Sequence, residues 1–196
     1  MDADRLSKQI EFIVEIDRLK HILRQTLLMD RSRRENDAEH SWHLAVMAML
    51  LSEYAREEVD LLRVLKMALV HDLVEIDAGD TFCYDEAAGA DKAERERKAA
   101  DRIFGMLPED LGVEVRGLWE EFDAMETPES RFANALDRFQ PLLHNFRTGG
   151  AAWRQHGVTR EQVIARNRHM EAGAPALWAY ASAMIEEAVR KGFLSH

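Results

Sequence analysis

Apolar residues recur every three or four positions along most of the chain, which is the spacing of one face of a helix. A first helix is predicted over residues 4–24, where Ile10, Ile13, Leu19 and Ile22 form a mixed apolar stripe. No segment alternates apolar and polar residues with the period of two that is typical of a strand. The pattern therefore predicts an all-α protein.

Residues that begin and end helices divide this pattern into about six to eight helices. Asn36 with Glu39, and Thr159 with Gln162, have the spacing of a capping box. Pro141 should bend the helix that Thr127 caps, since a proline removes a backbone donor. Helix starts are predicted at or just after the following residues: Asn36, Asp60, Pro108, Thr127, Thr159 and Pro175.

The chain of 196 residues has 10 Gly and 4 Pro, and no linker-like segment interrupts it. We therefore expect a single domain over residues 1–196, with helices in 159–191 packing on the rest. A formal net charge of −10 argues against a nucleic-acid polymer as partner, because such binding needs a basic surface. One cysteine allows no internal disulfide and fits a reducing compartment. The longest apolar run, "LAVMAMLL", is too short to span a membrane, so we expect a soluble, cytoplasmic protein.

The segment "LLRVLKMALVHDLVEI" is apolar almost all round, which indicates a buried helix. It nevertheless carries His71, Asp72 and Glu75, and a buried free carboxylate costs several kcal/mol. Because of their spacing of three and four, these side chains can project to one side. An adjacent His-Asp pair by itself is more often a capped or salt-bridged pair. Pairing and metal binding therefore both stay open.

The preceding predicted helix contributes two histidines, His40 in its first turn and His43 three residues later. The positive end of the helix dipole disfavours a charged imidazole, and the neutral form is the one that binds metal. For His43 we expect a packed helix-face histidine, whereas His40 can take either role.

Three segments together resemble the HD-domain metal-dependent phosphohydrolases. "AEHSWH", "HDLVEIDAGD" and "FANALDRFQ" contain the ordered pattern EH, HDxxE, GD and LD. The resemblance covers about residues 18–146 and is nearest to the bacterial 5′-deoxynucleotidases and their eukaryotic relatives. It implies an HD-type helical bundle.

The resemblance also implies roles for individual residues. One divalent cation would be held by four side chains: His40, His71, Asp72 and Asp137. Glu75 would orient or deprotonate the attacking water, Asp80 would face the substrate sugar, and Arg33 matches a basic family position that contacts substrate. Two imidazoles and two carboxylates suit Mn, Co, Fe, Ni or Zn, and Mg stays open. The context of Asp137 alone, beside Arg138, indicates a surface ion pair instead.

The sequence departs from the deoxynucleotidases where they carry an Arg-Trp pair that contacts the nucleotide. Gln25 and Thr26 align there, and neither can form an arginine's bidentate phosphate contact. We therefore expect a metal-dependent phosphohydrolase acting on a small phosphorylated substrate, with a nucleotide favoured. The alternatives are another phosphate ester, a nucleoside triphosphate, or a non-catalytic module in which the ion only joins helices. The resemblance also implies a homodimer.

Overall fold

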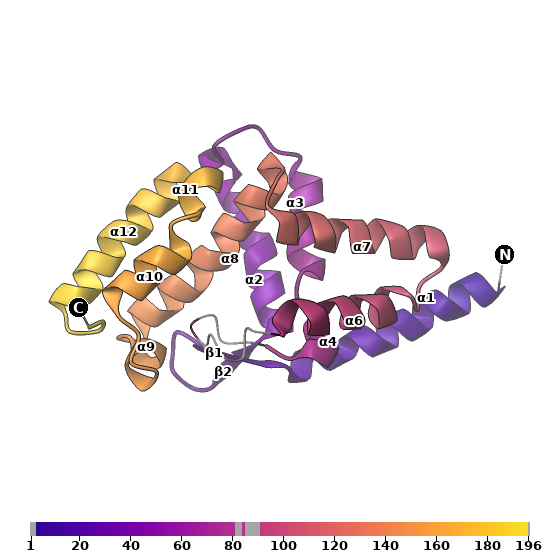
Figure 1. Cartoon of the computed structure of the whole chain (residues 1–196), viewed down its shortest axis with the longest axis horizontal. Helices are drawn as coiled ribbons and strands as arrows, with labels where there is room; N and C mark the ends of the chain where they lie inside the picture. The colour runs from indigo at the N-terminus through magenta and orange to yellow at the C-terminus, as the bar shows by residue number, and fades with distance from the viewer. Residues whose placement is uncertain (1–2, 81–83, 85–90, 196) are drawn as a thin grey trace.

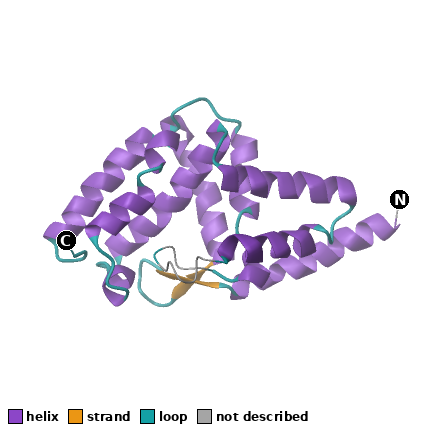
Figure 2. Cartoon of the chain, viewed as in Figure 1, coloured by secondary structure: helices purple, strands orange, loops and turns teal. Residues whose placement is uncertain are grey.

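The computed structural model describes residues 3–80, 84 and 91–195, and it confirms the predominantly helical fold (Figures 1 and 2). The described helices, in chain order, are α1 (Ala3–Ile16), α2 (Asp37–Leu51), α3 (Leu61–Val70), α4 (Glu75–Ala78), α6 (Lys92–Phe104), α7 (Glu109–Ala124), α8 (Pro128–Arg147), α9 (Ala151–Gln155), α10 (Arg160–Asn167), α11 (Met170–Gly173) and α12 (Pro175–Arg190). None of these described helices combines the length and the apolar character needed to cross a bilayer.

The helix starts lie where the capping residues predict them. The side chain of Asn36 accepts a hydrogen bond from the backbone N–H of Glu39 at 2.9 Å, which closes the predicted capping box of α2. Thr127 and Thr159 form capping boxes at α8 and α10, and Pro175 is the first residue of α12. These local signals are reliable because each cap satisfies backbone donors that the helix itself leaves unpaired.

One part of the fold differs from the helical prediction for residues 4–24. Helix α1 ends at Ile16, and a short 3-10 helix (Asp17–His21) leads into an antiparallel hairpin of β1 (Leu23–Leu27) and β2 (Arg34–Asn36). Arg31 turns the chain with a left-handed φ of 65°. Strands of five and three residues are too short for a period of two to stand out in the sequence.

The predicted helix through "LLRVLKMALVHDLVEI" is also interrupted. Helix α3 ends at Val70, a turn follows over residues 71–74, and α4 begins at Glu75. In the turn, the N–H of Leu73 bonds to the carbonyl of Val70 at 3.1 Å, and that of Glu75 to Asp72 at 2.9 Å. This tighter i to i+3 pattern re-aims the side chains of the turn relative to a continuous helix.

The turn at 71–74 lies between two hydrophobic clusters. Met67 and Ala68 belong to the cluster that surrounds α8, together with residues of α2, α3 and α12. Leu73 and Val74 belong to the cluster that includes residues of α1 and α6. Helix α8 runs through the middle of the molecule, and α11 and α12 pack against it (Figure 1). The polar side chains of the turn are therefore held by apolar packing on both sides.

Candidate active site

The structure brings the four predicted metal ligands together. His40 comes from α2, His71 and Asp72 from the turn after α3, and Asp137 from α8. The Nε2 atom of His40 lies 3.0 Å from Oδ1 of Asp137 and 3.9 Å from Oδ2 of Asp72. Nε2 of His71 lies 3.1 Å from Oδ1 of Asp72 and 3.8 Å from Oδ1 of Asp137. All four side chains are buried.

The two histidines are oriented as metal ligands usually are. Nδ1 of His71 donates to the carbonyl of Ala68 at 3.0 Å, and Nδ1 of His40 donates to Oε1 of Gln140 at 3.2 Å. Such bonds fix the tautomer and leave the lone pair of Nε2 facing the carboxylates. Nε2 of His71 is buried and has no hydrogen-bond partner. A donor set of two imidazoles and two carboxylates with an unsatisfied nitrogen fits a divalent ion.

The pKa values of these groups follow from burial and from their mutual contacts. Burial lowers the pKa of His40 to about 4, so this ring is neutral near pH 7. Burial acts to raise the pKa of Asp137, but Arg138 and the two histidines outweigh it and hold the pKa well below its usual range. His40 is therefore a neutral imidazole and Asp137 an ionised carboxylate, which are forms that bind metal. Burial acts to lower the pKa of His71, but Asp72 and Asp137 outweigh it and raise this pKa, so an ion there would displace a proton.

Glu75 lies beside this quartet as the first residue of α4, and it is 6% exposed. Asp37 forms a hydrogen bond with Glu75, and one oxygen atom from each of Asp37, Asp72 and Glu75 lies within 4.8 Å of the others. Burial raises the pKa of Glu75 well above its usual value, and the negative charges of Asp72 and Asp37 add to the shift. A buried carboxyl with a raised pKa is suited to accepting a proton near neutral pH.

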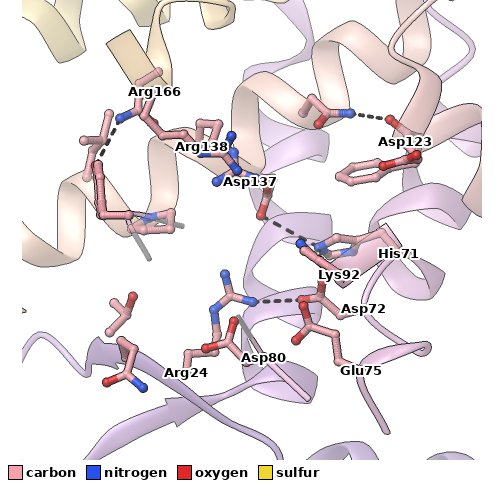
Figure 3. A pocket seen from close by; sticks show the side chains of 18 of the residues that line it. Arg24, His71, Asp72, Glu75, Asp80, Lys92, Asp123, Asp137, Arg138 and Arg166 are labelled. Atoms are coloured by element: carbon pink, nitrogen blue, oxygen red, sulfur yellow. Dashed lines mark hydrogen bonds and ion pairs between the residues drawn. The ribbon is translucent and has the colours of Figure 1, made fainter. Parts of the chain in front are cut away.

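Arg24 is a site residue that the sequence analysis missed. Its Nη1 donates to Oδ2 of Asp72 at 2.9 Å (Figure 3). The same Nη1 atom lies 3.1 Å from Oδ1 of Asp37. It comes from β1, directly before Gln25 and Thr26, the pair on which the sequence comparison concentrated. The sequence signal that could have identified Arg24 is charge balance, because several carboxylates predicted to be buried imply a buried cation near them.

His71, Asp72, Glu75 and Asp137 line a cavity of about 520 Å³. Basic side chains line it, and Figure 3 shows Arg138 and Arg166 across the cavity from Arg24. Trp119 and Phe122 contribute aromatic surface. The cavity lining thus combines carboxylates, basic side chains and aromatic rings, as expected for a small anionic ligand that contains a ring.

The two predicted substrate-binding residues are placed differently. Asp80 lines the cavity, and its carboxylate accepts a hydrogen bond from the backbone N–H of Gln25. Arg33 is not one of the described residues that line the cavity. It is exposed, and its Nη1 donates to Oε2 of Glu39 at 2.8 Å. Gln25 and Thr26 both line the cavity.

The sequence matches the HD-domain family model over residues 16–178, and the chain therefore belongs to the HD-domain family. Within this family it is similar to named 5′-deoxynucleotidases. Human 5′-deoxynucleotidase HDDC2 is 31% identical over 135 residues, which cover 68% of this chain and 65% of the human protein. The chain thus spans slightly less than two thirds of that relative's length. The Schizosaccharomyces pombe 5′-deoxynucleotidase hdd1 is 26% identical over 151 residues, covering 74% and 75%.

Solved structures agree with this assignment. The crystal structure of a predicted metal-dependent phosphohydrolase from Magnetospirillum magnetotacticum MS-1 is 61% identical, with a TM-score of 0.95 over 98% of this chain and 97% of that one. A conserved hypothetical protein from Pyrococcus furiosus shares the fold, with 24% identity and a TM-score of 0.62 over 92% and 99% of the two chains. The resemblance inferred from the sequence motifs is confirmed.

Proposed function

We propose that this protein is a metal-dependent phosphohydrolase that cleaves the phosphate monoester of a nucleotide, as a 5′-deoxynucleotidase does. The observation that carries the proposal is that His40, His71, Asp72 and Asp137 converge, and that the last three of them line a cavity whose wall also contains basic side chains. The similarity to HDDC2 supports a nucleotide as substrate.

The four side chains would hold one divalent ion. When bound, such an ion supplies a Lewis acid that polarises the phosphoryl group and lowers the pKa of water. Glu75 lies within reach of this cluster and is not one of the four ligands, so we assign it the removal of the proton from the attacking water. Arg24 holds Asp72 by an ion pair and keeps that ligand in place.

The remaining cavity residues would bind the substrate. We assign the phosphate to Arg138 rather than to Arg33, because Arg138 lines the cavity next to its ion-pair partner Asp137, whereas Arg33 does not line the cavity. Asp80 would accept a hydrogen bond from a sugar hydroxyl, and Trp119 with Phe122 would contact the base. A cationic side chain at the phosphoryl group stabilises charge that develops during hydrolysis.

The test is phosphate release from deoxy- and ribonucleoside 5′-monophosphates, nucleoside triphosphates and p-nitrophenyl phosphate. We expect the monophosphates to be the best substrates. Glu75→Gln should lower the rate by about 10²-fold or more, the usual contribution of a general base, while elemental analysis finds the metal content unchanged. The matched control is Glu114→Gln, an exposed carboxylate paired with Lys66, which should keep full activity.

Two outcomes would overturn the proposal. Release from triphosphates alone would indicate the alternative substrate class. No release from any substrate by metal-loaded protein would indicate a module in which the ion only joins helices.

We also propose the homodimer that the resemblance implies. Four apolar side chains of α1 are at least half exposed, and a second copy would cover such surface: Leu6, Ile10, Ile13 and Val14. Light scattering distinguishes one chain of 22.5 kDa from two.

A further inference from the structure

A second cluster of metal-ligating side chains lies beside His40. It consists of Glu35 from β2, His43 from α2 and His144 from α8. Each offers one ligand atom, and these three atoms all lie within 4.8 Å of one another. The sequence predicts that His43 is a packed helix-face histidine, and no sequence spacing singles out His144.

The ring of His40 separates this cluster from the HD ligands. Its Nε2 faces Asp137 at 3.0 Å, whereas its Nδ1 faces Oε1 of Gln140 at 3.2 Å. The amide nitrogen of Gln140 then donates to Oε1 of Glu35 at 2.6 Å. The two clusters thus lie on opposite edges of one imidazole and share no ligand, so the second cluster is a separate site.

The tautomer of His144 is set by its backbone contact. Its Nδ1 donates to the carbonyl of Leu27 at 3.0 Å, which leaves a lone pair on Nε2. This Nε2 atom is buried without a hydrogen-bond partner, in a residue that is 3% exposed, and it lies 4.0 Å from Oε1 of Glu35. Oε2 of Glu35 is likewise buried without a partner, in a residue that is 2% exposed. Each of the two side chains therefore has one buried acceptor atom without a hydrogen-bond partner.

No described protein group satisfies these two atoms. Even the 4.0 Å between Nε2 of His144 and Oε1 of Glu35 is too long for a hydrogen bond. Nε of Arg24 and Nδ1 of His40 each lie 3.9 Å from Oε2 of Glu35, which is beyond hydrogen-bond distance, and the Nη1 of Arg24 is bound to Asp72. A zinc-type ion binds imidazole nitrogen and carboxylate oxygen at about 2.0–2.2 Å, so one such ion spans the gap between Glu35 and His144.

We propose that Glu35, His43 and His144 bind a second divalent transition-metal ion of the Zn²⁺ class. Two imidazoles and one carboxylate are ligands that Zn²⁺, Co²⁺ and Ni²⁺ accept. His43 is half-buried beside the exposed Trp42, and this side gives an ion access from solvent. The second ion would lie next to the HD site, and Gln140, His40 and Arg24 lie between the two sites.

The test counts ions per chain. Protein stripped with a chelator is titrated with Co²⁺, whose absorption reports its ligands, and zinc content is measured by elemental analysis after dialysis. We expect two ions for the wild-type chain and one for each of His43→Gln and His144→Gln. The matched control, His21→Gln, removes an exposed histidine outside both clusters and should keep two.

A second set of variants isolates the new site. The double variant His71→Asn/Asp137→Asn disables the HD site and should still bind one ion, and adding His43→Gln should remove that ion. Circular dichroism checks that each variant folds. His43 is less buried than His144, so His43→Gln still tests the site if His144→Gln fails to fold. The proposal is overturned if the wild-type chain binds a single ion that His43→Gln does not remove, or if His43→Gln and His144→Gln both retain two. Because the readout is metal content, the result is independent of whether any phosphate ester is hydrolysed.

Discussion

At the scale of single residues, the sequence can predict a local contact correctly and still leave its burial unpredicted. The context of Asp137 indicates an ion pair with Arg138, and Nη2 of Arg138 does lie 3.3 Å from Oδ2 of Asp137. Asp137 is nevertheless only 5% exposed, and its other oxygen faces His40 and His71. Sequence neighbours reveal adjacent charges, whereas burial depends on elements distant in the chain. The metal role of Asp137 was accessible only through the family motif, and it stays a prediction.

Arg24 allows a prediction about buried charge. Arg24→Met should lower the free energy of unfolding of the metal-free protein by about 3 kcal/mol, since removing one partner leaves buried carboxylates uncompensated. Asp37→Asn removes one of these carboxylates, which already has a pKa raised to about 7 by burial and by Asp72. The double variant should therefore lose at least about 1 kcal/mol less than the sum of the single variants. Urea unfolding in the presence of a chelator measures all three, and strict additivity would contradict the assigned ion pairs.

At the scale of elements, helix starts were predictable and helix interruptions were not. A cap is a local arrangement of two residues three apart, as in Thr127 with Ser130 at α8. The break after Val70 has no such signature, because "LLRVLKMALVHDLVEI" contains neither Gly nor Pro. The turn there is held by tertiary packing of Leu73 and Val74 into a cluster with α6, which overrides the helical preference of the segment.

The contact between α11 and α8 gives a prediction at this scale. A Cβ at Gly173 would lie 2.0 Å from the carbonyl oxygen of Arg131, so the two helices must separate to admit it. We expect Gly173→Ala to reduce stability by about 2–3 kcal/mol, as overpacking does. Gly117 in α7 is the matched control, because a Cβ there meets nothing within 4 Å. Gly117→Ala should stabilise by up to about 1 kcal/mol through helix propensity. Equal effects of the two substitutions on urea unfolding would show that the helices are not in this close contact.

At the scale of the whole molecule, three separated stretches of chain meet at the ligand quartet. Helix α2, the turn after α3 and helix α8 each supply part of it, and both hydrophobic clusters support the turn. The helical class of the fold followed from periodicity and composition. The convergence of α2, the turn after α3 and α8 could not be predicted in this way, since it depends on helix packing angles that periodicity does not encode.

Metal removal tests this arrangement as a unit. Without an ion, the carboxylates of Asp72, Asp137 and Glu75 repel one another across the site. Saturating the site at 100 times the dissociation constant should add about 2.7 kcal/mol of stability, or roughly 5–10 °C in Tm for a chain of this size. Thermal melts with and without Mn²⁺ measure the shift, and His71→Asn should show a much smaller one. Identical melts of the wild-type protein with and without ions would mean that the quartet holds none.

The bond between His40 and Asp137 joins positions 97 residues apart in the chain. A fragment released by proteolysis anywhere between them keeps at most part of the chelating set, and a nascent chain lacks it until α8 has been synthesised. If the quartet binds an ion as proposed, only chains that contain both segments and have folded correctly would take it up tightly. Loading with a coloured ion such as Co²⁺ would consequently serve as a quality check that separates mature protein from truncated or misassembled material during purification.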